Sequence, residues 1–208
     1  EHGYVHARAR HSGRLRGAHY RFAGQTVTGT ENLMMAAVLA AGTTVLENCA
    51  REPEVADLAR LLQAMGARIE GAGTETLVIE GVDSLAGAHH AVIGDRIEGG
   101  TYLVGAALTG GDVTLEGVEP AHVLPLLEKL SETGARVEVL ASGIRVERGG
   151  ELRPRDILTA PHPGFPTDLQ AQYMTLMTQA SGVTTICETI FENRFQHAAE
   201  LERMGGDI

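Results

Sequence analysis

Hydrophobic and polar residues along this chain follow one pattern that recurs. A helix of small residues is predicted first, then a short β-branched strand, an amphipathic helix, and two strands with alternating side chains. The small-residue helices are expected at residues 30–41, 100–108 and 168–180. The β-branched strands are expected at residues 43–46, 113–115 and 183–186. Glycine or a pair of glycines stands after each of these helices, as is common at helix ends.

The second half of the pattern is clearest in the first two copies. Apolar residues recur there at helical spacing, at Val55, Leu58, Leu61, Leu62 and Met65, and at Val123, Leu126, Leu127 and Leu130. Alternating strands follow at residues 68–70 and 76–80, and at residues 136–139 and 143–147. Their alternation indicates one buried face.

Glycines that follow the amphipathic helices mark the period of the repeat. Gly66, Gly134 and Gly205 stand about 70 residues apart, so each copy is a supersecondary unit that must pack against its neighbours. The third copy is followed only through its second helix, and the chain begins without Met in the middle of the pattern. We therefore expect a fragment of a larger α/β (α+β) protein. Residues 83–95 carry little of the repeat and are expected to cross between two lobes.

Composition narrows the possible partners. The chain has 208 residues, 43% of them hydrophobic and none of them Trp, with a net charge of -10. This charge argues against general binding of nucleic acid or of a membrane surface. Arginines crowd only near the start, at Arg8, Arg10, Arg14, Arg16 and Arg21. They could form a basic arm, although arginines on an edge strand are the simpler interpretation.

Metal, thiol and membrane chemistry find little support. Cys49 and Cys187 form no C-x-x-C motif, and no pair of histidines has ligand spacing. We expect both cysteines to be reduced thiols in a cytoplasm, and neither to be a nucleophile. No apolar run is long enough to span a membrane.

The first candidate site is the start of the first small-residue helix, at residues 25–32. Thr28 followed by Glu31 fits a capping box, and Gly29 lies between them. Free backbone N–H groups and the positive end of the helix dipole at such a start suit a phosphate. A plain helix cap is the alternative.

The second candidate site is the proline-rich loop at residues 160–168. Its three prolines make the loop stiff, and it presents Thr167 and Asp168 at a helix start. The Asp168 carboxylate could accept a proton or a hydrogen bond from a sugar hydroxyl, or could simply cap the helix. Residues 188–195 follow the next strand and can approach the same end of the sheet. Arg194 there could bind a substrate phosphate or pair with a carboxylate.

Five segments together carry a resemblance to a known family. They are Thr26–Met35, Ala50–Glu54, Asp95–Glu98, Ala160–Asp168 and Glu192–Phe195. With them, essentially the whole chain resembles the enolpyruvyl (1-carboxyvinyl) transferases, in particular those that act on UDP-N-acetylglucosamine. The resemblance implies two lobes, each built from three βαβαββ units as an inside-out α/β barrel. Residues 1–94 would be the last part of the first, catalytic-loop lobe, and residues 95–208 the first part of the second lobe.

The resemblance also implies a function and its residues. Enolpyruvyl would pass from phosphoenolpyruvate to the 3′-hydroxyl of UDP-N-acetylglucosamine, the first committed step of peptidoglycan synthesis in the bacterial cytoplasm, without a metal or cofactor. Asp168 matches the catalytic general base. Substrate binding is implied for Gln25, Thr26, Val27, Thr28, Asp168, Ile190 and Arg194.

Departures from the family pattern limit this expectation. Thr28 stands where the family often has glycine, and a lysine sometimes found near Gly24 is absent. The family's phosphoenolpyruvate-binding and proton-donating groups fall outside these 208 residues, so the chain alone is not expected to catalyse the reaction. Two alternatives remain. One is the sister enzyme 3-phosphoshikimate 1-carboxyvinyltransferase, against which the HPGFPTD and ENRF segments argue, and the other is a non-catalytic binding or scaffold protein.

Overall fold

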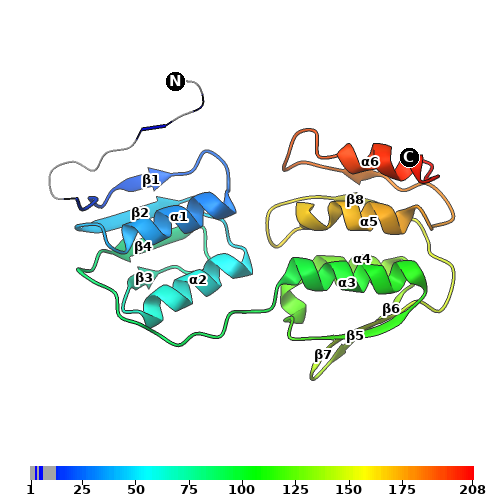
Figure 1. The fold of residues 1–208 in the computed structure, drawn as a ribbon, viewed down its shortest axis with the longest axis horizontal. Helices are drawn as coiled ribbons and strands as arrows, with labels where there is room; N and C mark the ends of the chain where they lie inside the picture. The colour runs from blue at the N-terminus through cyan, green and yellow to red at the C-terminus, as the bar shows by residue number, and fades with distance from the viewer. Residues whose placement is uncertain (1–2, 4, 7–12) are drawn as a thin grey trace. The chain divides into compact units, whose positions relative to one another are not determined.

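The chain folds into two compact units, residues 1–92 and residues 93–208, joined by an extended segment (Figure 1). The structure is a computed structural model and describes residues 3, 5, 6 and 13–208. Residues 81–95, which connect the units, form neither helix nor strand. The assignment of the two units to the two lobes of a transferase stays a prediction.

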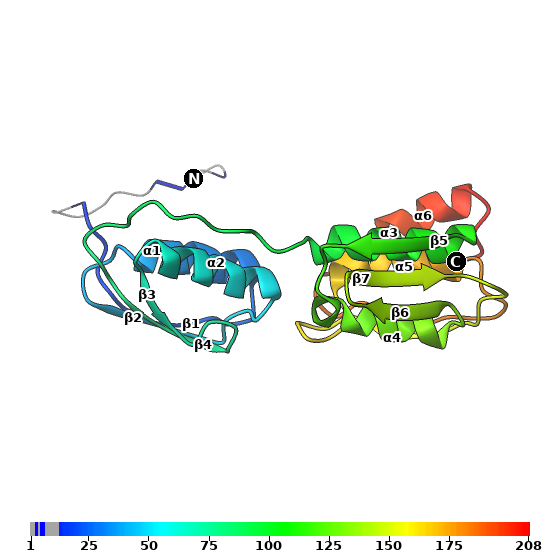
Figure 2. The same ribbon diagram turned by 90° about the horizontal axis from the view of Figure 1, so that it is seen from below.

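The first unit holds one complete copy of the repeat. Its elements are β1 (His19–Arg21), α1 (Val27–Ala37), β2 (Thr43–Glu47), α2 (Pro53–Ala64), β3 (Arg68–Glu70) and β4 (Thr76–Glu80). The sheet has the order β1-β2-β4-β3, with β1 parallel to β2 and the other pairs antiparallel. Both helices cover the same face of this sheet (Figure 2).

Alternation along the strands builds the core of this unit. In β2 and β4, Leu46 and Leu77 lie opposite each other and are buried, as is Ile79. They pack against Met34 of α1 and Val55 of α2. Full burial of an aliphatic side chain contributes about 1.5–3 kcal/mol to folding. The prediction of a sheet with one buried face is confirmed.

The second unit continues the repeat. Its elements are α3 (Arg96–Thr109), β5 (Asp112–Glu116), the 3-10 turn η1 (Pro120–His122), α4 (Leu124–Glu132), β6 (Arg136–Leu140), β7 (Gly143–Glu147), β8 (Ile157–Leu158), the 3-10 turn η2 (Thr167–Leu169), α5 (Gln170–Met177), β9 (Ile186–Cys187) and α6 (Gln196–Arg203). One sheet has the antiparallel order β5-β7-β6, and β8 pairs with β9 in parallel.

The predicted repeat is confirmed, with one difference between its copies. The run α3-β5-α4-β6-β7 reproduces α1-β2-α2-β3-β4, and the sheet order β5-β7-β6 corresponds to β2-β4-β3. A leading strand pairs in parallel with its successor in the first and third copies, as β1 with β2 and β8 with β9. Residues 81–95, ahead of α3, form no such strand.

Several predicted boundaries in this unit were wrong, and two of them have a clear physical cause. The third β-branched strand begins at Ile186 and not at Val183, because its partner β8 offers only two residues, and Val183 is exposed. Helix α3 begins at Arg96 and not at Gly100, because the Asp95 carboxylate accepts the N–H groups of Ile97 (2.8 Å) and Glu98 (3.1 Å).

Gly100 lets α3 approach its neighbours closely. A Cβ atom at this position would lie 2.7 Å from Leu169 Cδ1 and 3.0 Å from Leu126 Cδ2. Both leucines are fully buried, so neither can move aside easily. The turn η2, which carries Leu169, therefore packs directly against α3.

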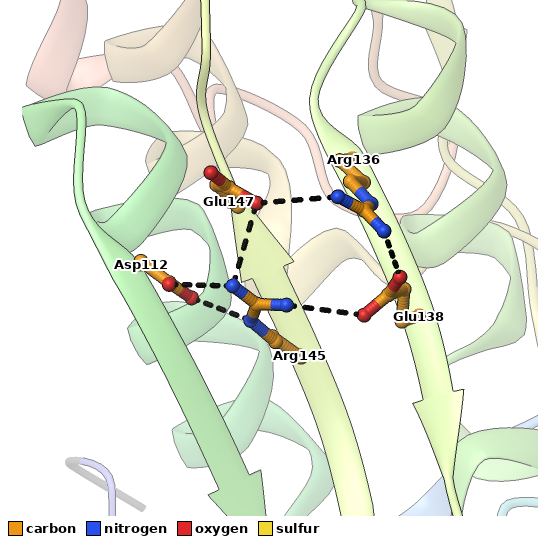
Figure 3. A network of polar contacts seen from close by, with 5 residues as sticks. All are labelled: Asp112, Arg136, Glu138, Arg145 and Glu147. Carbon is orange, nitrogen blue, oxygen red and sulfur yellow. Dashed lines mark hydrogen bonds and ion pairs between the residues drawn. The ribbon is translucent and has the colours of Figure 1, made fainter.

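A network of charged side chains lies along the three strands β5, β7 and β6 (Figure 3). Arg145 is its centre and donates to Asp112 through Nε (2.8 Å) and Nη2 (2.7 Å). Arg145 also pairs with Glu138 and Glu147, and Arg136 bridges the same two glutamates. The bidentate contact between Arg145 and Asp112 raises the pKa of the arginine and lowers that of the carboxyl.

Two of the arginines near the start, Arg14 and Arg21, make structural contacts. Arg14 donates to the backbone carbonyls of Leu39 (2.7 Å) and Val82 (2.7 Å). Arg21 lies on the edge strand β1 and pairs with Glu47. Arg8 and Arg10 lie outside the described residues. Among the helices that the structure describes, none is long and apolar enough to cross a membrane.

Candidate functional site

The start of α1 is built around Thr26. Its hydroxyl accepts the N–H of Gly29 (3.3 Å), and its carbonyl accepts both the N–H (3.0 Å) and the hydroxyl (2.7 Å) of Thr30. The buried Thr30 hydroxyl in turn accepts the N–H of Ala50 (3.1 Å), which fixes the helix start against the chain after β2. Gln25 adds a contact from its side-chain amide to the carbonyl of Cys49 (3.3 Å).

The predicted capping box at Thr28 and Glu31 was wrong. Thr26 is the N-cap, with an extended backbone, so α1 begins at Val27 and not at Thr30. Thr28 is instead the second helical residue and is exposed. Its N–H and that of Val27 belong to the first turn, where no intrahelical acceptor is available. The positive end of α1 therefore lies at residues 25–28, all four of which are the predicted ligands of this segment.

Gly29 keeps this helix start compact. A Cβ atom there would lie 2.4 Å from Thr26 Cγ2 and 3.3 Å from the Phe22 ring. Cys49, close by in sequence, is buried, and burial raises the pKa of its thiol, which fits the expectation that it is not a nucleophile.

The proline-rich loop before α5 is held by its own backbone and by Phe165. Ala160 N–H donates to the carbonyl of Phe165 (3.0 Å), and Gly164 N–H to that of Pro161 (2.8 Å). Phe165 is buried and meets the ring of Tyr173 edge-on, with centroids 5.4 Å apart. The loop delivers Thr167 and Asp168 to the turn η2 in a defined position.

The parallel pair β8–β9 brings the second loop beside the first. Beyond the strands, Thr189 donates its N–H to the hydroxyl of Thr159 (2.9 Å) and its own hydroxyl to the Thr159 carbonyl (2.6 Å). The neighbouring residue, Glu188, contacts the other loop: its Oε2 accepts the hydroxyl of Thr167 (2.8 Å). The loop at 188–195 and the loop at 160–168 are thus joined by side chains.

Arg194 completes this cluster. Its Nη2 donates to Asp168 Oδ1 (2.7 Å) and its Nη1 to the Thr167 hydroxyl (2.8 Å). The guanidinium also lies over the ring of Phe191, 5.1 Å from the centroid. We name these residues the Asp168 cluster: Thr167, Asp168, Glu188, Phe191 and Arg194.

The structure does not support the interpretation of Asp168 as a helix cap. No side chain caps η2 or α5, so Asp168 does not serve as a helix cap. Its carboxylate pairs with Arg194 instead, and half of its side chain is exposed. A substrate phosphate and a carboxylate were the partners predicted for Arg194, and in the structure it pairs with a carboxylate. Ile190, the remaining predicted residue of this segment, donates its N–H to Glu188 Oε1 (2.8 Å).

Glu188 was missed from sequence as a functional candidate. It follows a β-branched run and reads as a strand residue, whereas in the structure it holds three donors at once. Burial opposes its ionisation, but the N–H of Ile190 and the hydroxyl of Thr167 outweigh burial and lower its pKa. One signal in the sequence could have identified Glu188. It stands one residue beyond the strand, and on an extended backbone its side chain points to the opposite side from that of Thr189.

A metal site and a pocket are the other kinds of functional site to consider. Within the described residues, no group of three or more His, Cys, Asp or Glu side chains is placed to hold a metal ion. A pocket of about 530 Å³ borders the strands β8 and β9 and is lined by Lys129, Asp156, Phe165 and Cys187, among others. The lining includes none of the site residues predicted above, all of which lie in the described part of the chain.

Comparison with known proteins gives the class to which this fold belongs. The repeated βαβαββ fold is shared with a solved enolpyruvyl transferase. Residues 1–208 match the family of EPSP synthase (3-phosphoshikimate 1-carboxyvinyltransferase). The chain belongs to this family.

Curated relatives narrow the similarity. Proteins named UDP-N-acetylglucosamine 1-carboxyvinyltransferase match over all of this chain, with 57% identity in Acidobacterium capsulatum, 56% in Psychrobacter sp. and 58% in Anaeromyxobacter sp. (strain K). These matches cover 47%, 48% and 49% of the respective relatives. The chain spans about half the length of the curated relatives it matches.

Solved structures agree with the fold. The enolpyruvyl transferase NikO from Streptomyces tendae matches 84% of this chain and 42% of its own, with a TM-score of 0.72 and 31% identity. An EPSP synthase from Acinetobacter baumannii matches 90% of this chain and 45% of its own, with a TM-score of 0.56 and 22% identity. The second likeness concerns the fold alone. The predicted fold class is confirmed, and the described residues close no barrel.

Proposed function

We propose that this chain is part of an enzyme that transfers enolpyruvyl from phosphoenolpyruvate to the 3′-hydroxyl of UDP-N-acetylglucosamine, in the cytoplasm of a bacterium. Relatives that carry this name and share 55–58% of their residues over the whole chain support the substrate. The Asp168 cluster is the observation that carries the chemistry, because it holds an accessible carboxylate in a fixed place.

The reaction requires a base at the sugar hydroxyl. The 3′-oxygen bonds to C2 of phosphoenolpyruvate while C3 gains a proton, which gives a tetrahedral ketal. The bond from C2 to the phosphate oxygen then breaks and C3 loses a proton, which restores the vinyl group and releases phosphate. Asp168 takes the hydroxyl proton in the first step. Its contact with Arg194 uses Oδ1, so Oδ2 can face the substrate.

The start of α1 supplies the second part of the proposal. Backbone N–H groups at Val27 and Thr28, with the positive end of the helix, would bind the diphosphate of the sugar nucleotide. Gln25 and Thr26 hold this helix start in place. Ile190 and Arg194 are the remaining residues proposed to bind substrate.

We further propose that segments outside these 208 residues complete both lobes and bind phosphoenolpyruvate. The chain spans about half the length of its relatives, which supports this. Leu33 and Met35 on α1, and Leu39 just after it, are each more than a third exposed, as expected of a surface that another segment covers. We do not expect the chain by itself to turn over substrate.

The test compares Asp168→Asn with the unchanged full-length protein. Asparagine keeps the shape and can still accept from Arg194, but it cannot take a proton at neutral pH. We expect turnover to fall about 10²- to 10⁴-fold, while calorimetric affinity for UDP-N-acetylglucosamine changes by only about 2- to 3-fold. An equal loss of turnover and affinity would contradict the role of base.

Asp83→Asn is the matched control. Asp83 also pairs with an arginine, Arg14, at 2.7 Å, but its side chain is 95% exposed and lies in the first unit. This variant should keep full activity. The same titration separates the alternatives: binding of shikimate 3-phosphate instead of the sugar nucleotide would identify the sister reaction. Binding of the sugar nucleotide without turnover would favour a non-catalytic protein.

A further inference from the structure

One side chain joins the two loops of the Asp168 cluster. Glu188 Oε2 accepts the Thr167 hydroxyl at 2.8 Å, while its Oε1 accepts the N–H of Ile190 at 2.8 Å and that of Phe191 at 3.1 Å. The carboxylate therefore anchors η2 on one side and shapes the turn toward Arg194 on the other. A carboxylate, with acceptors only, suits a place where every neighbour donates.

The directions of these hydrogen bonds follow from the donor count. Thr167 has one hydroxyl proton and gives it to Glu188, so the hydroxyl oxygen is free to accept from Arg194 Nη1 at 2.8 Å. Arg194 Nη2 then donates to Asp168 at 2.7 Å. In this series of contacts, from Glu188 through Thr167 and Arg194 to Asp168, each hydrogen bond determines which group donates and which accepts in the next.

We propose that Glu188 is a positioning residue for the transfer reaction, which orients the Asp168 carboxylate through Thr167 and Arg194. This inference rests on the proposed function and deepens it. It also fixes how Ile190 can serve a ligand: with its N–H given to Glu188, its carbonyl oxygen is the backbone group left to face the sugar nucleotide.

The local fold does not depend on Glu188 alone. Thr189 is tied to Thr159 by two hydrogen bonds of 2.9 Å and 2.6 Å, and β8 pairs with β9 independently. The Arg194 carbonyl also accepts from the side-chain amide of Gln170, which is buried, at 3.5 Å. A change at Glu188 should therefore alter the orientation of the cluster and leave the unit folded.

Glutamine cannot replace this glutamate without conflict, although it has the same size. If its NH₂ group faces Ile190 and Phe191, donors meet donors. If its NH₂ group faces Thr167, the hydroxyl receives two donors, from Arg194 and from the amide, and its own proton loses its acceptor. Either arrangement disturbs the contact that holds Arg194.

The experiment uses full-length protein with Glu188→Gln, Thr167→Val and Thr167→Ser. We expect the first two to lower kcat about 10- to 100-fold, with KM for both substrates changed about 3-fold or less. Thr167→Ser keeps the hydroxyl and should restore most of kcat. In the double variant Glu188→Gln with Thr167→Val, the loss should be well below the product of the single losses, because both break one chain of contacts.

Glu200→Gln is the control, since Glu200 forms only a surface pair with Arg203 in the same unit. It should leave kcat unchanged. A Glu188→Gln enzyme with kcat within about 2-fold of the unchanged protein would overturn the proposal. So would a Thr167→Ser variant as slow as Thr167→Val.

A second readout does not depend on the reaction. Hydrogen exchange of the amides of Ile190 and Phe191, followed by mass spectrometry, should become faster in Glu188→Gln and stay unchanged in Glu200→Gln. If the unchanged protein neither binds UDP-N-acetylglucosamine nor turns over, the proposed function fails. The exchange data then still report whether Glu188 organises this turn, and unchanged exchange would overturn that part.

Discussion

Asp168, Thr167 and Arg194 lie up to 27 residues apart in sequence, and the folded backbone brings their side chains together. From sequence, the stiff loop singled out the first two, and the position after a strand singled out the third. The sequence predicted that the two loops could approach each other and that Arg194 could pair with a carboxylate. It did not identify Asp168 as that carboxylate, because this contact depends on the parallel pairing of β8 with β9 and on a turn in which Asn193 adopts a positive φ of 57°. Glu188 was missed because its partner Thr167 lies in another segment, and its contacts with Ile190 and Phe191 depend on the turn that follows it.

The titration of Glu188 gives a prediction at this scale. Its pKa is lowered from 4.5 in the folded protein, so the ionised carboxylate stabilises the fold above pH 4.5. This contribution declines as the pH falls below 4.5 and is lost once the pH passes the lower pKa of the folded state. The difference in Tm between the unchanged protein and Glu188→Gln should therefore be largest near neutral pH and shrink in acid.

Thermal unfolding measured between about pH 3 and about pH 7 checks this. Glu200→Gln serves as the reference for the loss of an exposed carboxylate. A Tm difference for Glu188→Gln that stays constant over the whole range would show that the carboxylate is not what stabilises the turn.

Secondary structure elements were easier to predict than single contacts. Strong alternation gave β3, β4 and β7 with the bounds that the structure shows, because each has one buried face. Errors arose at helix starts, where a side chain three residues away decides the boundary, as Thr26 does for α1. The strand β9 is shorter than its β-branched sequence indicates, since strand length depends on the partner.

The network on β5, β7 and β6 leads to a prediction for these strands. Arg145 contacts three carboxylates from three strands, so Arg145→Gln leaves Asp112, Glu138 and Glu147 close together without their shared cation. We expect a lower Tm, and a smaller decrease in high salt because the contacts are exposed to solvent. Arg203→Gln, which breaks only a surface pair on α6, should change Tm far less. A Tm loss that is the same at low and high salt would contradict an electrostatic role for this network.

At the scale of the whole molecule, each unit has a hydrophobic core of its own. One is centred on Met34, Leu46 and Ile79, the other on Leu103, Leu126 and Leu176. In the sequence, the weak repeat signal at residues 83–95 indicated a crossing between two lobes, and residues 81–95 form neither helix nor strand.

Separate expression of residues 13–92 and 93–208 tests this division. Each piece should unfold cooperatively on heating, and the far-UV circular dichroism of the two should add up to that of the whole chain. The smaller piece is expected to be the less stable, because a shorter chain buries a smaller fraction of its surface. A piece without a cooperative transition would show that its core needs the other unit.

Gly100 has a consequence for how variation in this protein should be interpreted. Its missing Cβ makes room for Leu169, which adjoins Asp168 in the turn η2. A single added methyl group at Gly100 would push on this turn from behind. In a mutational scan scored by growth, Gly100 would then rank with the residues that touch substrate, although it belongs to a buried helix face. Conservation or resistance at this position would report how the turn η2 packs beneath Asp168, not a contact with any ligand or inhibitor.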